Sequence, residues 1–357
     1  MLNLISFIKE NYNWEKLITE KPYCITVKRK DNFIMFNYSQ IDSDFYNPIV
    51  KECRGIILEA NTYKPVCVPF YKFGNYGEGY IDTIDWNTAR VQEKVDGSLI
   101  KVWHYDNKWH VSTNGTIDAK DAILMSDVSE YKTFYDLFLK AANNCRLIIQ
   151  TLNKNYTYMF ELTSPYNRVV VPYQDIAIRH IGTRDNITLQ ELNIYIGVDK
   201  PRSYNFTSLN QCIAMAKELP FSDEGYVVVD NNWHRIKVKS PAYVAAHHLK
   251  NNGIVTRERI IEIIRQNEKE EFLTYYPEYL NSFQSVLFDI AVFANDIEHD
   301  IDYAKQNIDL NNRKEFALYA TKTKCPAALF CWLDGKYTDV TDWIWEQSNE
   351  KIIKMIG

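Results

Sequence analysis

The stretch Glu93-Lys94-Val95-Asp96-Gly97-Ser98 combines a lysine with a tight turn between two segments that read as strands. The lysine ends a polar and apolar alternation, and Asp-Gly is a dipeptide typical of tight turns. This arrangement would present one amine at the lip of a sheet, where it could act as a nucleophile. A hairpin with an ordinary surface lysine explains the same pattern, so the turn alone does not establish a function.

Charged residues further along the chain fit a phosphate pocket. Glu161 lies among apolar residues late in the segment YMFELT, where a carboxylate needs a partner because burying it alone is costly. Glu224 and Gly225 open the apolar run YVVV. Lys237 and Lys239 are two residues apart in HRIKVKS, so both side chains point to one face of a strand. Together with the lysine turn, these residues indicate a pocket that binds phosphate.

The order KVDGS, FEL, EGYVV and KVK resembles the motifs of the covalent nucleotidyltransferases, which include DNA ligases, RNA ligases and mRNA capping enzymes. In these enzymes a lysine attacks the α-phosphate of a nucleoside triphosphate and holds the nucleotide as a phosphoramidate. The attacking amine must be neutral, and a lysine has an ordinary pKa of about 10.4. Neighbouring cations favour the neutral amine and stabilise the charge that grows on the phosphate.

Residues upstream of the turn narrow the resemblance to one branch. DNA ligases and capping enzymes usually carry an arginine shortly after the turn, and residues 98–101 contain none. An arginine stands upstream instead, Arg54 in ECRGII, and Lys72 follows in PFYKFG. The series ECRGI, KF, KVDGS, FELTSPYNRV, EGYV and KVKS resembles the phage-type RNA ligase 1 family, the tRNA-repair ligases of T-even phages. The resemblance covers roughly residues 30–245.

The resemblance implies catalytic roles for four residues. Lys94 would be the nucleophile that carries AMP, and Lys237 and Lys239 would clamp the α-phosphate. Glu224 would bind a metal ion or orient Lys94. The implied cofactors are ATP and Mg²⁺, for which Mn²⁺ could substitute, because carboxylate and phosphate oxygens are the ligands that Mg²⁺ prefers.

The same resemblance implies that Lys94, Lys237 and Lys239 contact the nucleotide together with four further residues. Arg54 would contact its sugar or phosphates, and Lys72 would meet the outer phosphates and help expel pyrophosphate. Glu161 would hydrogen-bond the ribose, and Tyr243 matches an aromatic residue of the family pocket.

Several positions depart from the family pattern or leave alternatives open. The family tends to place a lysine immediately before Gly115, where this chain has Asn114, so a phosphate contact is weaker or comes from Lys120. Gly74 replaces a second aromatic residue after Lys72-Phe73, and Phe36 stands near a nucleotide-site tyrosine of the family. Asn167-Arg168 match the family either as scaffold of the pocket or as a contact to the RNA end.

Composition limits the class of protein. The 357 residues predict two domains, and 46% hydrophobic with 24% charged residues is typical of a globular protein. The net charge of −5 falls entirely after residue 240, so a nucleic-acid site has to be a local basic groove.

The seven cysteines form no C-x-x-C pair, which argues against a disulfide framework and a zinc ribbon. We expect a reduced cytoplasmic location, in the host if the chain is phage-encoded, without a membrane span.

Residue periodicity predicts an α+β fold followed by helices. Residues 1–20 read as one helix, and residues 23–240 as short strands in packed antiparallel sheets. Hairpin tips are expected at Asp106-Asn107 and Asn231-Asn232. Helices are expected over these segments: about 119–143, about 207–218 with Ser208 as N-cap, 241–251, 255–270, 278–307, 310–322 and 340–356.

These patterns predict an adenylyltransferase domain over residues 1–245 and an all-α domain over 246–357. The second domain matches the position of the family's tRNA-recognition module, and its acidic charge suggests that it reads RNA shape at a few points. The predicted activity is that of an ATP-dependent RNA ligase acting on RNA 5′-phosphate and 3′-hydroxyl ends, with no obligate protein partner. Its substrate stays open between broken tRNA, such as a cleaved anticodon loop, general single-stranded RNA and single-stranded DNA. The alternatives are a capping-type guanylyltransferase that uses GTP, and a non-catalytic nucleic-acid-binding descendant.

Overall fold

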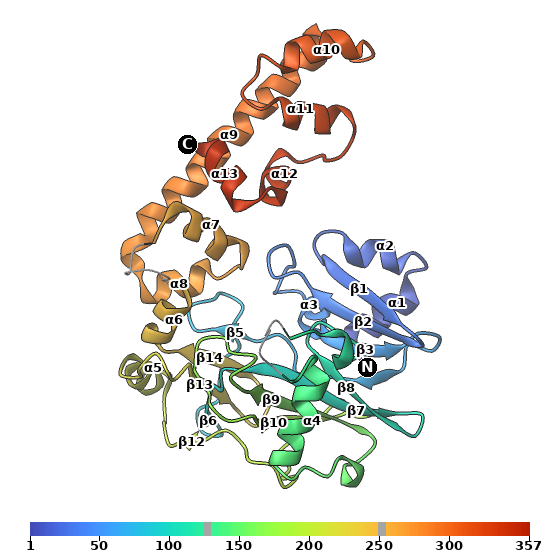
Figure 1. Cartoon of the computed structure of the whole chain (residues 1–357), viewed down its shortest axis with the longest axis vertical. Coiled ribbons are helices and arrows are strands. Elements are labelled where there is room, and N and C mark those ends of the chain that lie inside the picture. The colour runs from blue at the N-terminus through green and yellow to red at the C-terminus, as the bar shows by residue number, and fades with distance from the viewer. Residues whose placement is uncertain (125–129, 249–254) are drawn as a thin grey trace. The chain divides into compact units, whose positions relative to one another are not determined.

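The computed structural model describes residues 1–124, 130–248 and 255–357 (Figure 1). The chain divides into two compact units, Met1–Lys250 and Asn251–Gly357. The first unit mixes helices with three sheets, and the second unit is helical in its described part. The α+β class with packed antiparallel sheets and a helical C-terminal region is therefore confirmed. The assignment of residues 1–245 to adenylyl transfer and 246–357 to RNA recognition stays a prediction.

The first sheet has four antiparallel strands and two covered faces. Its strands, in spatial order, are β1 (Ile25–Lys30), β2 (Phe33–Tyr38), β3 (Arg54–Glu59) and β4 (Pro65–Cys67). In β2 the side chains of Ile34 and Phe36 pack among the N-terminal helices, while Phe33 and Met35 pack against Trp103 of the second sheet. Successive strand residues point to opposite faces, so a continuous apolar run marks a strand buried on both sides.

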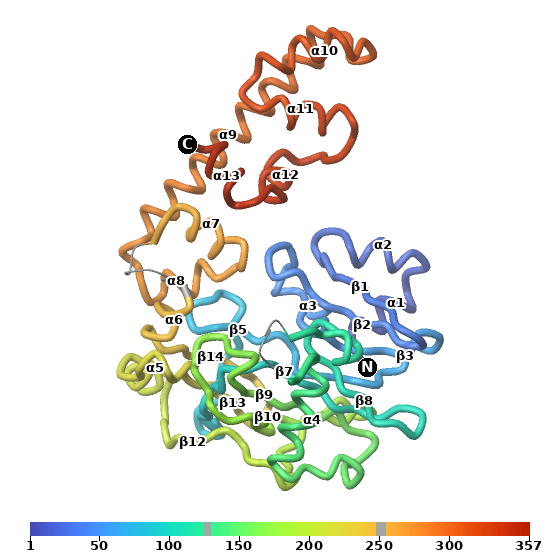
Figure 2. The backbone as a smooth tube through the Cα atoms, in the orientation of Figure 1, coloured from blue at the N-terminus to red at the C-terminus, as the bar shows by residue number. Residues whose placement is uncertain are grey.

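The second sheet has five antiparallel strands. They are, in spatial order, β11 (Glu191–Leu192), β10 (Ala177–Asp185), β9 (Tyr156–Thr163), β7 (Ser98–Tyr105) and β8 (Lys108–Thr113). Helix α4 (Phe134–Asn144) covers one face of this sheet, as Figures 1 and 2 show. The predicted turn Asp106-Asn107 joins β7 to β8, and both residues have positive φ angles of 45° and 59°. This hairpin prediction is confirmed, and the positive φ angles are the reason that Asp and Asn suit the turn.

The third sheet carries the strands on either side of the lysine turn. Its strands, in spatial order, are β12 (Ser203–Tyr204), β6 (Arg90–Glu93), β13 (Gly225–Val229), β14 (Arg235–Lys239) and β5 (Gly74–Asn75). The pairings are antiparallel, with β5 joining β14 in parallel. Ile236 and Val238 of β14 pack with helix α5 (Leu209–Lys217), which leaves the alternate residues of that strand on the other face. Asn231-Asn232 lie in the loop between β13 and β14, as predicted.

The helices of the first unit differ from the prediction in two places. The expected single helix over 1–20 is wrong, because α1 (Asn3–Glu10) ends before its C-cap residue Asn11 and α2 (Trp14–Thr19) begins after Asn13. Asparagine favours helix ends over helix interiors, and here it separates two short helices. Helix α3 (Pro48–Glu52) lies just before β3, and its Glu52 carboxylate accepts hydrogen bonds from the Asn3 and Leu4 amides at 3.0 and 2.8 Å.

The predicted helix over 119–143 is also wrong as a single element. A 3₁₀ turn, η1 (Ala119–Asp121), is followed by the bridge between Ile123 and Thr133, and residues 125–129 of the prediction lie outside the described part. Thr133 and Asp136 form a capping box that begins α4 at Phe134. The prediction of α5 with a Ser208 cap is confirmed, since the Ser208 side chain accepts from the Gln211 amide. A second 3₁₀ turn is η2 (Ile149–Thr151).

The last helix of the first unit is α6 (Pro241–His248), and residues 249–251 of its predicted span are outside the described part. The second unit consists of these elements: α7 (Arg257–Arg265), α8 (Lys269–Tyr275), η3 (Pro277–Tyr279), α9 (Leu280–Asn307), α10 (Arg313–Ala320), α11 (Pro326–Leu333), α12 (Val340–Glu346) and α13 (Asn349–Ile356). Helices α7, α11, α12 and α13 pack against α9. The sequence missed α11, because PAALFCWL is apolar on all sides and lacks helical periodicity.

Ser348 divides the predicted helix over 340–356, because its side chain caps α13 by accepting from the Lys351 amide. Among the described residues, the structure contains no helix long and apolar enough to cross a membrane.

Candidate active site

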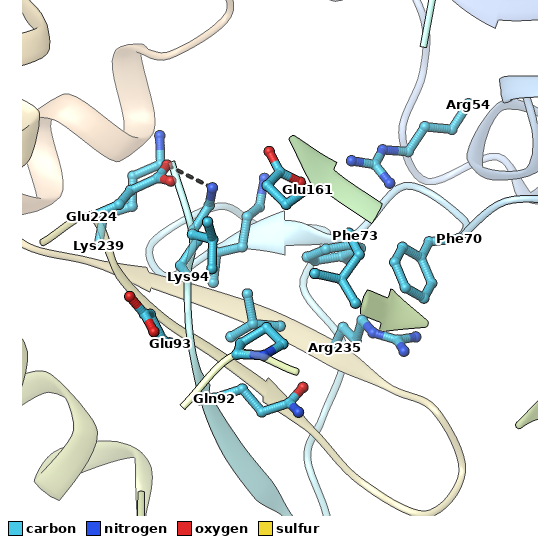
Figure 3. A pocket seen from close by; sticks show the side chains of 15 residues that line it. Arg54, Phe70, Phe73, Gln92, Glu93, Lys94, Glu161, Glu224, Arg235 and Lys239 are labelled. Carbon is cyan, nitrogen blue, oxygen red and sulfur yellow. Dashed lines mark ion pairs between the residues drawn. The ribbon is translucent and has the colours of Figure 1, made fainter. Parts of the chain in front are cut away.

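A pocket of about 180 Å³ is lined by residues from all three sheets of the first unit (Figure 3). Arg54 comes from the first sheet, Glu161 and Ile181 from the second, and Gln92 and Val227 from the third. Six of the eight predicted site residues line this pocket: Arg54, Lys94, Glu161, Glu224, Lys237 and Lys239. Residues separated by more than a hundred positions therefore meet in one cavity.

Lys94 lies directly after β6, with its amine at the wall of the pocket. Its backbone amide donates to the Gly225 carbonyl at 2.8 Å, which continues the ladder between β6 and β13. Its Nζ lies 2.6 Å from Oε1 of Glu224, and this ion pair is drawn as a dashed line in Figure 3. The Lys94 side chain is 21% exposed and that of Glu224 is 5% exposed. The amine is thus oriented by a buried carboxylate and stays accessible from the pocket.

The turn after Lys94 is fixed by a buried carboxylate and a close backbone approach. Asp96 Oδ2 accepts hydrogen bonds from the backbone amides of Val170 and Val171 at 2.9 and 2.7 Å. Its Oδ1 accepts a hydrogen bond from the Tyr243 hydroxyl at 2.9 Å. A Cβ atom at Gly97 would lie 2.4 Å from the Leu162 carbonyl oxygen, so any other residue would push the turn away from β9. The Asp-Gly pair therefore positions the lysine and packs the turn on the second sheet.

Tyr243 is buried at 3% exposure on α6 and is absent from the residues that line the pocket. Its hydroxyl donates to Asp96 and its ring stacks on that of His247 at 6.2 Å. In this structure Tyr243 supports the lysine turn from behind, whereas the sequence pointed to a place in the nucleotide pocket. Its role toward a nucleotide stays a prediction.

Two carboxylates in the pocket are shifted toward their neutral forms. Burial raises the pKa of Glu161 to about 7, although the Lys94 ammonium opposes this shift. Burial also raises the pKa of Glu224, against the charges of Lys94 and Lys239. Carboxylates with raised pKa values accept a proton more readily from a neighbouring ammonium, which suits them to proton transfer.

The pocket also fits a divalent cation that is shared with a ligand. Oε2 of Glu224 is buried and has no hydrogen-bond partner among the described residues. In the same part of the chain, no group of three or more His, Cys, Asp or Glu side chains could hold a metal ion. Mg²⁺ is usually held by one or two carboxylates together with substrate phosphates and water. Glu224 therefore fits a cation that phosphate oxygens help to bind, rather than a cage made by the protein alone.

The cations of the pocket come from two sheets. Lys237 and Lys239 both face the pocket from β14, as their spacing predicted. Lys237 Nζ lies 5.3 Å from the centre of the Phe73 ring, and the guanidinium of Arg54 lies 5.4 Å from the same centre. Nη1 of Arg54 is buried without a hydrogen-bond partner in the described chain. A buried donor without a partner is costly, so this arrangement favours an anionic ligand.

Lys72 lies in a neighbouring pocket of about 440 Å³ that shares Phe73 and Arg235 with the first. Its side chain is 6% exposed, and its Nζ lies 4.5 Å from the centre of the Phe45 ring and 5.2 Å from that of Tyr38. No carboxylate of the described residues pairs with this ammonium. The structure thus separates Lys72 from the other predicted residues, and its contact with outer phosphates stays a prediction.

Other residues that the sequence singled out lie outside the pocket. Phe36 is fully buried beside Trp14, and Lys120 lies over the Tyr135 ring at 4.8 Å. The side-chain amide of Asn167 donates to Ser98 Oγ at 3.0 Å and to the Leu162 carbonyl at 2.8 Å. These contacts support the interpretation of Asn167 as scaffold.

The sequence did not identify several residues that line the pocket. Gln92 of β6 and Val227 of β13 are register partners and lie side by side at the pocket, and Ile181 of β10 also lines it. Arg235 binds Glu191 through two hydrogen bonds at 2.9 and 2.6 Å and packs on Phe70. The alternation that selected Lys237 and Lys239 extends two residues back to Arg235, so that residue could have been found. The apolar residues that line the pocket have no sequence feature that distinguishes them from residues of the hydrophobic core.

The contact between Tyr243 and Asp96 generates a first prediction. Tyr243→Phe removes one of three hydrogen bonds to a buried carboxylate, so the free energy of unfolding should fall by about 1–3 kcal/mol. Denaturant titration measures the change. Tyr166→Phe is the control, because the hydroxyl of Tyr166 makes no hydrogen bond to the described residues, and its effect should be within about 0.5 kcal/mol. Equal effects in both variants would contradict the assignment.

The raised pKa of Glu161 generates a second prediction. In the folded chain this carboxyl holds its proton up to a pKa of about 7, against an ordinary 4.5, so the folded state loses stability as the pH rises through that window. Glu161→Gln mimics the protonated form and should be more stable than the unmodified chain at pH 8, by on the order of 2–3 kcal/mol. The difference should disappear near pH 4. A constant difference across this range would show that ionisation is not its cause.

Comparison with known proteins agrees with this geometry. A family described as RNA ligase matches residues 52–243. A protein of Autographa californica nuclear polyhedrosis virus, named as a bifunctional polynucleotide kinase/RNA ligase, is 30% identical over 309 residues, which are 79% of this chain and 43% of that protein. An RNA ligase of Rhodothermus phage RM378 is 25% identical over 337 residues, 76% of this chain and 75% of the phage protein.

The chain thus spans less than half the length of the viral protein. A solved structure of a Naegleria gruberi RNA ligase mutant with AMP and Mn is 16% identical, has a TM-score of 0.37, and covers 49% of this chain and 61% of its own. A TM-score this low supports no inference about function. The family match extends over more than half of the chain and includes all eight predicted site residues. The chain belongs to the RNA ligase family.

Proposed function

We propose that this chain is an ATP-dependent RNA ligase in which Lys94 carries AMP. The ion pair between Lys94 and the buried Glu224 is the main support, because it holds an amine in a pocket lined by cations. Family membership supports the joining of RNA ends, and the predicted motif order supports the covalent intermediate. A GTP-dependent capping enzyme and a non-catalytic binding protein are the alternatives.

Adenylation begins with proton transfer from Lys94. Oε1 of Glu224 lies 2.6 Å from Nζ, within hydrogen-bond distance, and its raised pKa makes it a suitable acceptor for the proton. The neutral amine then attacks the α-phosphorus of ATP. As the bond from nitrogen to phosphorus forms, the nitrogen loses a second proton to the solvent, and the bond to the bridging oxygen breaks to release pyrophosphate. Lys237 and Lys239 stabilise the negative charge that develops on the phosphate.

Glu224 would hold the divalent cation together with the phosphate oxygens, since its Oε2 is buried without a partner in the described chain. When bound, this cation would neutralise phosphate charge and favour attack at phosphorus. Arg54 would supply its unsatisfied Nη1 to the same nucleotide. Glu161 is near enough to Lys94 for its pKa to respond to the ammonium charge, and it would accept a hydrogen bond from the ribose.

The pocket offers a slot for a purine base. Ile181, Val227 and Pro201 supply apolar surface, and the carboxamide of Gln92 makes no hydrogen bond to the described residues. A glutamine can both donate to and accept from an adenine edge, which presents a donor beside an acceptor. On the N7 edge, guanine presents two acceptors, N7 and O6, where adenine presents the N7 acceptor and the N6 donor. Gln92 therefore supports the choice of ATP as the nucleotide.

The next two steps transfer AMP and seal the strand. An oxygen of an RNA 5′-phosphate attacks the phosphorus of the Lys94 adduct, the bond from nitrogen to phosphorus breaks, and the Lys94 nitrogen takes back a proton. The RNA 3′-hydroxyl then attacks the 5′-phosphorus, loses its proton and expels AMP, which leaves a 3′-5′ phosphodiester. The substrate that we propose is broken RNA, including a tRNA cleaved in its anticodon loop, with the helices after residue 255 as the recognition module.

A ligation assay separates the substrate classes. A tRNA nicked in its anticodon loop is compared with linear single-stranded RNA and with single-stranded DNA of equal length. Faster sealing of the nicked tRNA supports the repair role. Equal sealing of the two RNAs would make the enzyme a general RNA ligase, and preference for DNA would contradict the RNA assignment.

Labelled nucleotide tests the proposed function directly. Incubation with ATP that is labelled at the α-phosphate should place label on the unmodified chain, and Lys94→Ala should abolish that label because the nucleophile is lost. Lys108→Ala is the matched control, because Lys108 is an exposed lysine at the start of β8. Circular dichroism checks that both variants fold. Label from GTP alone would favour the capping enzyme, and labelled Lys94→Ala would refute the nucleophile.

Glu224 generates a separate prediction about the metal. Glu224→Gln keeps the shape and removes the negative charge, so adenylation should fall by about 100-fold or more because the proton acceptor is lost. The Mg²⁺ concentration for half-maximal rate should also rise, since one anionic ligand is missing. Asp223→Asn is the control, because Asp223 faces Arg202 at 3.5 Å instead. Unchanged Mg²⁺ titration in Glu224→Gln would remove Glu224 from the metal site.

A further inference from the structure

A fully buried lysine lies outside the pocket, in the middle of β7. Lys101 has 0% exposure. Along β7 the side chains of Ile100 and Val102 pack in the core beneath α4, whereas Lys101 and Trp103 point the other way, toward the first sheet. Lysine is almost never fully buried without an anionic partner. This position is therefore an exception that packing does not explain.

Among the residues that the structure describes, no anion compensates the charge of Lys101. Its Nζ donates a hydrogen bond to the carbonyl of Gly55, and no carboxylate of the described residues forms an ion pair with it. Burial lowers the pKa of Lys101 to about 8, with Cys67 opposing this shift and the neighbouring Arg54 guanidinium contributing to it. Burying an ammonium that has no counter-charge is costly for the free energy of folding. The lysine is therefore better explained by the site that it touches than by stability.

The residue that Lys101 contacts lies in a distortion of β3. Gly55 has a φ of +76° and follows Arg54, at the place where the pairing of β2 with β3 shifts register. A Cβ atom on Gly55 would lie 2.7 Å from Lys101 Nζ and 2.7 Å from the Asn114 carbonyl oxygen. The bulge is therefore packed against the ammonium. Bulges re-aim the side chain beside them, and here that side chain is Arg54.

We propose that Lys101 is a positioning residue of the adenylation site, whose ammonium fixes the Gly55 bulge and thereby aims the Arg54 guanidinium into the pocket. This inference rests on the proposed function. Arg54 is anchored on its other side by Glu52, two residues earlier, whose carboxylate binds the first turn of α1. The short segment from Glu52 to Gly55 is thus held at both ends, and its central arginine keeps an unsatisfied Nη1 for a ligand.

Asn114 supports the same interpretation from the neighbouring strand. The family resemblance leads us to expect a lysine at position 114, which is asparagine here. Lys101 pairs with Ser112 in the β7–β8 ladder, two residues before Asn114. Oδ1 of Asn114 lies 3.3 Å from the Cβ position of Gly55, close to the point that the Lys101 ammonium reaches. The Lys101 ammonium, which comes from β7, thus contacts the Gly55 bulge in a chain that has no cation at position 114.

A double-mutant cycle tests the proposal with the full chain. Adenylation is followed against ATP concentration in the unmodified chain, Lys101→Met, Arg54→Ala and the double variant. Lys101→Met should raise the half-saturating ATP concentration by about tenfold, the size of one lost charge-assisted contact, with a maximal rate within about threefold. In the Arg54→Ala background the same substitution should add less than about twofold, because the residue through which it acts is gone.

The outcomes separate this inference from the proposed function. If the unmodified chain takes no label from ATP, the proposed function fails. The positioning role alone is overturned in either of two cases in which the unmodified chain is labelled. In the first, Lys101→Met has the same half-saturating ATP concentration as the unmodified chain. In the second, the effects of Lys101→Met and Arg54→Ala on that concentration multiply in the double variant. A structural role would lower the melting temperature, whereas methionine in place of a buried charge should leave it equal or higher. Should Lys101→Met not fold, Lys101→Arg decides: it keeps charge and donor, so half-saturation within about threefold supports the role and a tenfold rise contradicts it.

Discussion

The ion pair between Lys94 and Glu224 is the interaction around which the first unit is arranged. A carboxylate that is 5% exposed tolerates its charge when cations lie beside it, and Lys94 Nζ lies 2.6 Å from Glu224 Oε1. The same carboxylate keeps Oε2 without a partner in the described chain. One oxygen of this carboxylate is therefore left for a further partner. Under the proposed function, a cation held with the nucleotide would be that partner.

Holding this pair requires the backbone to be fixed on both sides of the lysine. Before Lys94, β6 is paired with β13, the strand that follows Glu224. After Lys94, Asp96 is held by two backbone amides and by Tyr243, and Gly97 packs directly on the backbone of β9. The Lys94 amine thus stands where the second and third sheets meet. The motif residues that carry no reactive group are needed because they place the amine, which is how preorganised sites gain their effect.

The fold was predictable where local signals are strong. The hairpin at Asp106-Asn107 and the Ser208 cap follow from residues whose backbone preferences decide the structure locally. The break between α1 and α2 and the late start of α4 were missed, because the predicted helices followed apolar spacing and ignored Asn11 and the Thr133 capping box. Six of the eight predicted site residues line one pocket, because the order of the motifs along the chain carried information that residue spacing alone lacks.

The sequence by itself determined which groups this protein has for chemistry: one lysine before an Asp-Gly turn, a pair of lysines on one strand face, and carboxylates inside apolar runs. The tertiary structure decided which of them touch. It paired Lys94 with Glu224, placed Tyr243 behind the turn, put Lys72 in a separate aromatic pocket and buried Lys101 against Gly55. These contacts join residues far apart along the chain, so they depend on how three sheets pack and in which register their strands pair. Local residue preferences do not encode that packing.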